Sequence, residues 1–270
     1  MAGVASASLQ GWSIQMTTPP WQDHTYVTSS CGLVWQCWGG CSGGTALSAA
    51  LGSSIVADCL SQPNSQAGIV YGITGVCHQT SNRILHSARV TVVGCQGYNL
   101  SVFAYGVYGA GNWPQLSVCY PHGTVPAQPG STRAASPGRN LSSMTELYNS
   151  SVSEARMTAV TEEATRLTEL SALVEMALGH PLDQETFRAL SSIQTALWNL
   201  RTALTTRLNN GELTPNQYLV QLDASLRSAM EQSRVLLGDE RFKMIFGEAG
   251  EHPERLINAT TFMEQTIADA

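Results

Sequence analysis

The chain of 270 residues is poor in charge, since charged residues make up only 13 % of it, against about a quarter in an ordinary globular protein. Lys243 is the only lysine, so a Schiff-base mechanism would depend on that residue alone. The net charge of −6 and the lack of a basic run give no electrostatic support for binding nucleic acid or an anionic membrane. No apolar run reaches the length of a membrane-spanning helix. Residues 1–6 lack the basic and apolar regions of a secretory signal, so we expect a cytoplasmic location.

Cysteine is absent after residue 119, which divides the chain into two parts of different composition. The first part contains seven cysteines: Cys31, Cys37, Cys41, Cys59, Cys77, Cys95 and Cys119. An odd number of cysteines in a chain without a signal sequence argues against a complete disulfide framework. Four of the seven are expected to be buried, reduced thiols: Cys31, Cys59, Cys95 and Cys119.

The cysteine-containing part, residues 1–120, is predicted to be an α+β domain with a small antiparallel sheet and a cysteine-bearing helix. Alternating, β-branched and aromatic residues predict strands at 21–28, 88–94 and 100–109, and residues 116–120 are expected to add a last strand. The turn at Gln96 and Gly97 would join the middle two strands as an antiparallel pair. Residues 1–20 are expected to form an irregular arm or a first strand, and residues 45–60 a loop or a short helix.

Residues 121–142 are rich in proline, glycine and serine and are predicted to form a linker. Residues 143–270 are predicted to be all-helical, as a bundle or hairpin. Ser143 opens a first helix, Asp183 caps a second, and Thr214 with Gln217 caps a third. Their apolar residues recur at three-to-four spacing, which indicates helix packing. Such faces often exceed what one chain can cover, so the helices favour a homo-oligomer.

Cys77 follows a glycine-punctuated segment and opens a predicted short helix. The unpaired N–H groups and the partial positive charge of a helix N-terminus stabilise a thiolate, so a thiol placed there can be a nucleophile. A nucleophilic thiol also needs a base within hydrogen-bond reach. His78 is adjacent, but successive side chains on a helix point about 100° apart. His24, on an early predicted strand, is therefore the candidate base.

A histidine strand followed by a cysteine that opens a later helix resembles the circularly permuted branch of the papain-like NlpC/P60 superfamily. That branch includes LRAT-like and PPPDE-type thiol hydrolases. The resemblance covers roughly residues 20–110, through the strand that begins at His24 and through Tyr71 and the helix from Cys77 onward. The chain departs from the pattern at Val76, where asparagine is common. No matching position identifies the third, orienting residue, for which Gln36 is our candidate.

The resemblance implies a cysteine-dependent hydrolase or acyltransferase that acts on an amide or ester bond of a peptide or acyl substrate, without a cofactor. Cys77 would attack a carbonyl as the thiolate, with His24 as its base. Backbone N–H groups at the helix start would hold the oxyanion. His24 would then protonate the leaving group.

Three other interpretations remain open. Gly75-Val76-Cys77 and a Gly97-Tyr98 strand are similar to a transglutaminase-like site, which would need His122. Cys37 and Cys41 could form half of a zinc site that Cys59 or the Cys77-His78 pair completes. The third interpretation is a non-enzymatic protein that assembles or binds partners through its C-terminal helices. Nucleic acid is not an expected partner, because the tryptophans have no basic neighbours.

Overall fold

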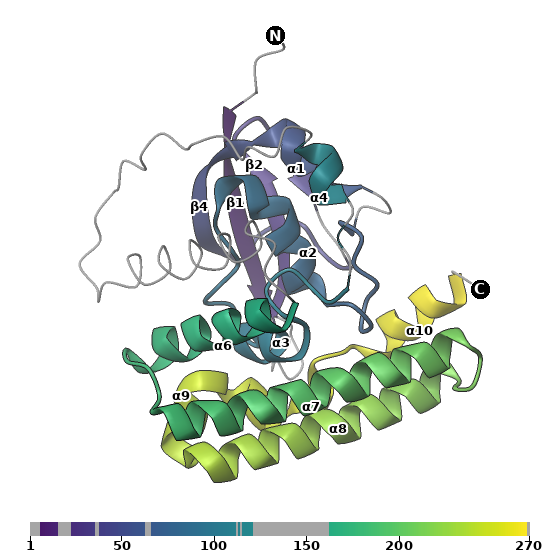
Figure 1. The fold of residues 1–270 in the computed structure, drawn as a ribbon. Helices are drawn as coiled ribbons and strands as arrows, with labels where there is room; N and C mark the ends of the chain where they lie inside the picture. The colour runs from purple at the N-terminus through teal and green to yellow at the C-terminus, as the bar shows by residue number, and fades with distance from the viewer. Residues whose placement is uncertain are drawn as a thin grey trace.

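The computed structural model describes residues 6–15, 23–35, 38–62, 66–111, 113, 115–120 and 162–268. Its first part, the sheet half (described residues up to 120), contains a sheet and short helices. Its second part, the helical half (residues 162–268), contains long helices packed below the sheet in the view of Figure 1. The α+β class, with an all-helical C-terminal region, is therefore confirmed.

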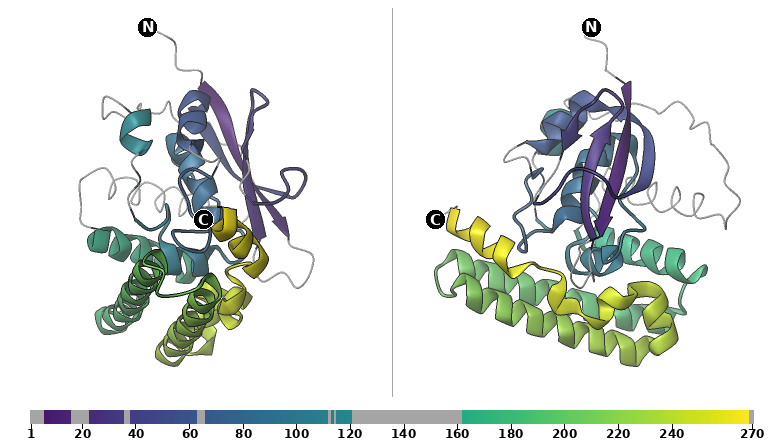
Figure 2. Two further views of the ribbon diagram at one scale, coloured as in Figure 1. Left: turned by 90° about the vertical axis from the view of Figure 1, so that its right-hand side faces the viewer. Right: turned by 180° about the vertical axis from the view of Figure 1, so that it is seen from behind.

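Four antiparallel strands form one sheet: β1 (Ser6–Gln15), β2 (Asp23–Ser29), β3 (Val34–Trp35) and β4 (Thr45–Ser53). Their order is β3-β2-β1-β4. Alternate residues of β1 are buried, as expected for a strand with one face on the core. Leu9 of β1 and Val27 of β2 are fully buried there. Helices α1 (Ser54–Ser61) and α2 (Cys77–Ile84) lie on one face of this sheet (Figure 2).

Three predicted strands are wrong. Residues 88–94 leave the short helix η1 (Leu85–Ala88) as irregular chain, residues 98–105 form helix α3 (Tyr98–Tyr105), and helix α4 (Gln115–Cys119) replaces the last strand. Helix α3 is buried on nearly every side, so aromatic and β-branched residues occupy half of its positions. A short, wholly apolar run does not distinguish a buried helix from a strand. Conversely, the segment expected to be a loop or short helix contains β4 as well as α1.

The cysteines also differ from expectation. Cys59 of α1 and Cys119 of α4 form a disulfide, and Cys31 is an exposed thiol. Cys95 is a buried thiol, as predicted. Because the disulfide partners are 60 residues apart, spacing gave no sign of the pair. Disulfides persist mainly in oxidising compartments, and the cytoplasmic location stays a prediction.

The helical half contains α6 (Glu162–Leu178), α7 (Gln184–Asn209), α8 (Pro215–Leu237), α9 (Asp239–Phe246) and α10 (Ala259–Ala268). The short helices η2 (Glu248–Glu251) and η3 (Pro253–Arg255) join α9 to α10. Helices α7 and α8 lie side by side as an antiparallel hairpin (Figures 1 and 2). None of the described helices has the length and apolarity needed to cross a membrane.

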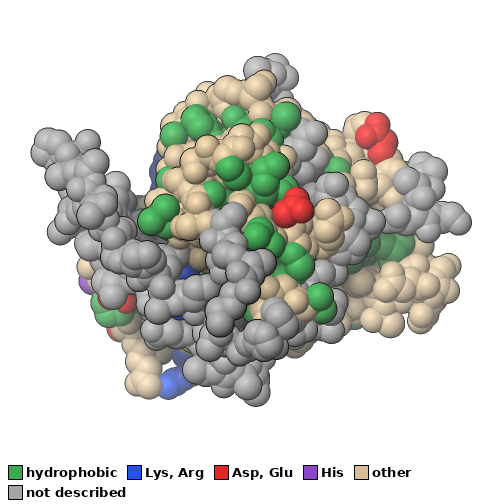
Figure 3. Space-filling model, turned by 90° about the horizontal axis from the view of Figure 1, so that it is seen from above, with side chains coloured by type: hydrophobic (Ala, Val, Ile, Leu, Met, Phe, Trp, Pro, Cys, Tyr) green, Lys and Arg blue, Asp and Glu red, His purple; other side chains and the backbone are tan. Residues whose placement is uncertain are grey.

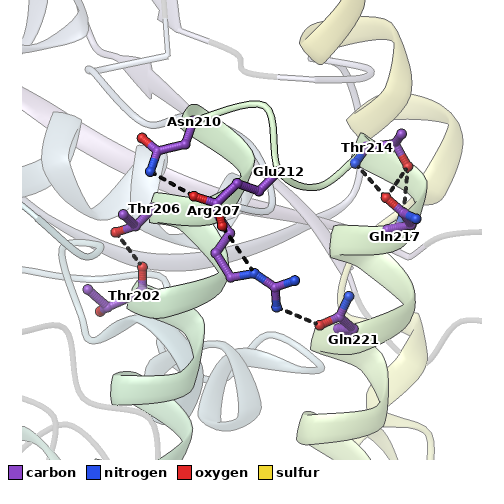
Figure 4. Close-up of polar contacts among 8 residues, drawn as sticks. All are labelled: Thr202, Thr206, Arg207, Asn210, Glu212, Thr214, Gln217 and Gln221. Atoms are coloured by element: carbon purple, nitrogen blue, oxygen red, sulfur yellow. Dashed lines mark hydrogen bonds and ion pairs between the residues drawn. The ribbon is translucent and has the colours of Figure 1, made fainter.

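The predicted helix caps of the hairpin are confirmed. Asp183 Oδ1 accepts a hydrogen bond from the Thr186 N–H at 2.9 Å. Thr214 and Gln217 form a reciprocal capping box at the start of α8, which Figure 4 shows beside the α7–α8 turn. The predicted linker and the cap at Ser143 lie outside the described residues.

Candidate active site

Cys77 is the first residue of α2, at the helix N-terminus that the sequence predicted. The preceding residue, Val76, is extended and donates its N–H to Gln79 Oε1 at 3.0 Å, which fixes the entry of the chain into the helix. Cys77 itself is only 6 % exposed. The helix dipole therefore acts on a thiol that is largely shielded from water, where electrostatic interactions are stronger.

His24, the second residue of β2, forms a side-chain hydrogen bond with Cys77. Its other polar contact is with the main chain, because Nε2 lies 2.8 Å from the carbonyl oxygen of Gly40. A carbonyl can only accept, so Nε2 carries the proton and donates it. The neutral ring then presents Nδ1 as the nitrogen that can accept the proton of a thiol.

The environment of His24 favours its protonated form. Burial lowers the pKa of His24, but the hydrogen bond and the charge attraction of Cys77 raise it, and the hydrogen bond to Gly40 adds to the rise. The net result is a pKa above the ordinary value of 6.5.

The loop of residues 38–44 holds His24 in place. Gly39 has a φ of 139°, and a Cβ there would lie 3.3 Å from Nε2 of His24, so glycine permits the close approach of this loop to the ring. The ring of Trp38 packs edge-on against Tyr71 with centroids 4.7 Å apart. At the other end of the loop, Tyr26 Oη donates to the Gly43 carbonyl at 2.7 Å.

The Gly40 carbonyl makes the polar contact with His24 for which Gln36 was the candidate. Gln36 lies outside the described residues. The sequence could not reveal the role of Gly40, because every residue carries a carbonyl and only the path of the loop selects this one.

A second polar cluster meets at the main chain of Asp23. Its carbonyl oxygen lies 3.7 Å from Cys77 Sγ and 3.0 Å from His78 Nε2. The other ring nitrogen of His78, Nδ1, lies 2.9 Å from Ser101 Oγ. His78 is thus fully buried and engaged at both nitrogens, which leaves His24 as the histidine that contacts the thiol. The Asp23 carboxylate accepts hydrogen bonds from the Ser13 hydroxyl and from the Gln96 N–H.

The polar residues of α2 are buried, and several of them hold neighbouring loops by hydrogen bonds. Asn82 donates to the Val107 carbonyl at 2.7 Å and accepts from the Val92 N–H at 2.9 Å. Arg83 donates to the carbonyls of Tyr108 and Ala67. These contacts with the main chain fix α2 and its N-terminal thiol within the sheet half.

The helical half holds the segment that precedes Cys77. This segment, residues 71–75, is bound through the carbonyls of Gly72 and Ile73 and the hydroxyl of Tyr71. The donors from the helical half are Tyr218 Oη to Gly72, Arg201 Nη1 to Ile73 at 2.9 Å, and the Asn258 N–H to Tyr71 Oη at 3.1 Å. Gly72 has a φ of 74°, and a Cβ there would lie 2.7 Å from Phe262 of α10. The entry to the cysteine helix therefore depends on contacts from α7, α8 and α10.

The alternative sites find less support. Within the described ranges, no group of three or more His, Cys, Asp or Glu residues is placed to hold a metal ion. Cys59 belongs to the disulfide, and Cys37 lies outside those ranges. Gly97 and Tyr98 begin helix α3, where a transglutaminase-like site would have a strand, and His122 is not among the described residues.

Comparison of the chain with protein-family models, with curated proteins and with solved structures found no match. The relationship to the NlpC/P60 superfamily is therefore carried by the short motifs alone and stays a prediction.

Proposed function

We propose that this protein is a cysteine-dependent hydrolase or acyltransferase that acts on an amide or ester bond. The observation that carries the proposal is the hydrogen bond between Cys77 and His24, with the proton of His24 Nε2 directed to Gly40. A nucleophile, its base and a group that orients the base are the parts that covalent acyl transfer requires.

The mechanism follows from these parts. The thiolate of Cys77 attacks the carbonyl carbon of the substrate, while His24 holds the thiol proton on Nδ1. N–H groups at the start of α2 stabilise the oxyanion, apart from that of Gln79, which donates to the Val76 carbonyl at 3.1 Å. Collapse of the tetrahedral intermediate transfers the proton from Nδ1 to the leaving amine or alcohol and leaves a thioester on Cys77. Water then releases the acid, or another nucleophile takes the acyl group.

The test is the rate at which iodoacetamide alkylates Cys77 near neutral pH, followed at each cysteine by mass spectrometry. The exposed Cys31 would compete, because a hydrogen bond from Ser29 lowers the pKa of Cys31, so a Cys31→Ser background is used. We expect Cys77 to react faster than Cys95, and His24→Asn to slow Cys77 by at least about tenfold through loss of the base.

The matched control is His180→Asn, which removes an exposed histidine of the helical half and should leave the rate at Cys77 unchanged. If Cys77 reacts no faster than the buried Cys95, or if His24→Asn leaves its rate unchanged, the enzyme proposal fails. The interpretation as an assembly or partner-binding protein would then take its place.

A further inference from the structure

A cavity of about 490 Å³ lies where the sheet half meets the helical half. One wall is the loop of residues 93–99, which leads into α3. The other walls are the end of α6 and the segment from α9 into η2. Figure 1 shows α3 between the sheet and these helices. Its volume is within the range of small-molecule sites, about 300–1,000 Å³.

The chemistry of the cavity suits an uncharged, apolar group. Its floor is formed by buried residues, among them Tyr98, Ile245 and Phe246. Met244 stands at the rim and is 51 % exposed, so a flexible thioether borders the opening. Among the described residues that line the cavity, Glu248 is the only charged one. None of the lining residues that the structure describes is cationic, so none of them can pair with an anionic ligand.

The loop that lines this cavity is also bonded to the candidate active site. The N–H of Asp23 donates to the Gln96 carbonyl at 3.0 Å, and the Gln96 N–H donates to the Asp23 carboxylate at 3.0 Å. Asp23 directly precedes His24, and its carbonyl contacts Cys77 Sγ. Cys95 also lines the cavity; burial raises the pKa of its thiol, and the nearby charges of Cys77 and Asp23 raise it further. The cavity is therefore a neighbour of the reacting thiol.

We infer that this cavity binds an uncharged apolar part of the substrate on which Cys77 acts, either an acyl chain or an apolar side chain. The inference rests on the proposed function, and it gives the helical half a part in substrate binding. The acyl chain and the apolar side chain have the same chemistry here: each is an apolar group of a few carbon atoms or one ring, on the side of the reacting carbonyl.

The first arm of the test measures binding without reaction. The probe is N-phenyl-1-naphthylamine, a neutral apolar fluorophore, titrated into the full chain. Ala177→Trp places an indole in the cavity from α6. Because the indole fills space that the probe would occupy, binding should weaken by about tenfold. Met244→Glu is a second variant and should also weaken binding. Because Met244 is exposed at the rim, this change does not require the protein core to repack. Val235→Trp, at a position 77 % exposed on α8, is the matched control and should bind as the wild type does.

The second arm measures coupling to Cys77. Iodoacetanilide and iodoacetamide carry the same reactive group, but only the first has an apolar ring. We expect the ratio of their alkylation rates to be higher at Cys77 than at Cys31, which serves as the exposed reference in the same molecule. The ratio at Cys77 should fall in Ala177→Trp and in Met244→Glu, whereas the ratio at Cys31 should not change.

The two arms separate the failure of each claim. Unchanged binding of the fluorophore in both cavity variants would overturn the cavity as an apolar site. Binding that weakens in these variants, with equal rate ratios at Cys77 and Cys31, would overturn its link to the thiol. Failure of Cys77 to react with either reagent would overturn the proposed function and, with it, the substrate role of the cavity.

Discussion

At the level of single residues, the site depends on which ring nitrogen of His24 carries its proton. The Gly40 carbonyl decides this, since it accepts the Nε2 proton at 2.8 Å. A main-chain carbonyl from a glycine loop, and not a side chain, holds this nitrogen of the ring. The close approach of Gly39 to the ring makes this contact sterically feasible.

Asp223 of α8 gives a prediction about stability and pH. Its Oδ1 is buried and has no hydrogen-bond partner among the described residues. Burial raises the pKa of Asp223 from 3.8 to about 6; Arg227 opposes this rise and Glu254 adds to it. A carboxyl group whose pKa is higher in the folded protein stabilises the fold while protonated, and this contribution is lost as the pH rises through about 6.

We therefore expect Asp223→Asn to be more stable than the wild type at neutral pH, by about 1 kcal/mol after allowance for the partial exposure of the group. The difference should shrink as the pH falls below the ordinary aspartate pKa. Urea unfolding of both proteins across this pH range measures it. A difference that does not change with pH would show that the ionisation of Asp223 is not its cause.

At the level of secondary structure elements, the helical half depends on local signals at its helix ends. The capping box of Thr214 and Gln217, with Pro215 at the first helical position, starts α8 (Figure 4). Arg207 links the two helices by pairing with Glu212 in the turn and donating to Gln221 of α8. These last contacts are exposed, so each contributes little to stability.

Thr214→Ala should reduce the free energy of unfolding by about 1 kcal/mol, because the first turn of α8 loses its side-chain acceptor. The matched control is Thr206→Ala, an exposed threonine inside α7. Alanine is the better helix former there, so this change should be neutral or slightly stabilising. Equal destabilisation by the two variants, in chemical unfolding, would contradict the capping role of Thr214.

The caps explain why the helical half could be predicted and the sheet half only in part. Asp183 and Thr214 each accept a hydrogen bond from the N–H three residues later. Such local contacts can be predicted from the sequence. The segment at 98–105 has strand-like residues, but contacts with α6, α7 and α9 determine its helical form. The candidate pair of Cys77 and His24 was found from the order of elements. Its orienting carbonyl and the Cys59–Cys119 disulfide depend on loop paths that the sequence does not specify.

At the level of the whole molecule, charge is concentrated in the second part of the chain. The charged residues of the first 120 positions are Asp23, Asp58, Arg83 and Arg89. Figure 3 shows this end of the molecule from above, with hydrophobic side chains spread over it and few charged side chains among them. The sheet half therefore offers little electrostatic steering for a charged substrate, in agreement with an uncharged group as the ligand of the cavity.

The two halves are joined by buried hydrogen bonds as well as apolar contacts. Glu169 of α6 accepts from the Val107 N–H at 3.0 Å, and Trp198 of α7 donates to the Phe103 carbonyl at 3.0 Å. Breaking the halves apart would exchange each of these hydrogen bonds for one to water, a net loss of about 0.5–1.5 kcal/mol for each bond, and would expose the apolar surface around them.

We therefore predict that the halves unfold together. Hydrogen exchange followed by mass spectrometry in rising urea should give peptides from α2 and from α7 the same free energy of opening. Loss of protection in α7 at a urea concentration where α2 remains protected would show instead that the helical half is an independent unit.

The most direct measurement of the central claim is the titration of His24 by NMR, in the wild type and in Cys77→Ser. Cys77 raises the pKa of His24 against the lowering effect of burial. Removal of the thiol should therefore lower the pKa of His24, while the hydrogen bond to Gly40 remains. An unchanged pKa of His24 in Cys77→Ser would contradict the pairing of the two residues and the mechanism based on it.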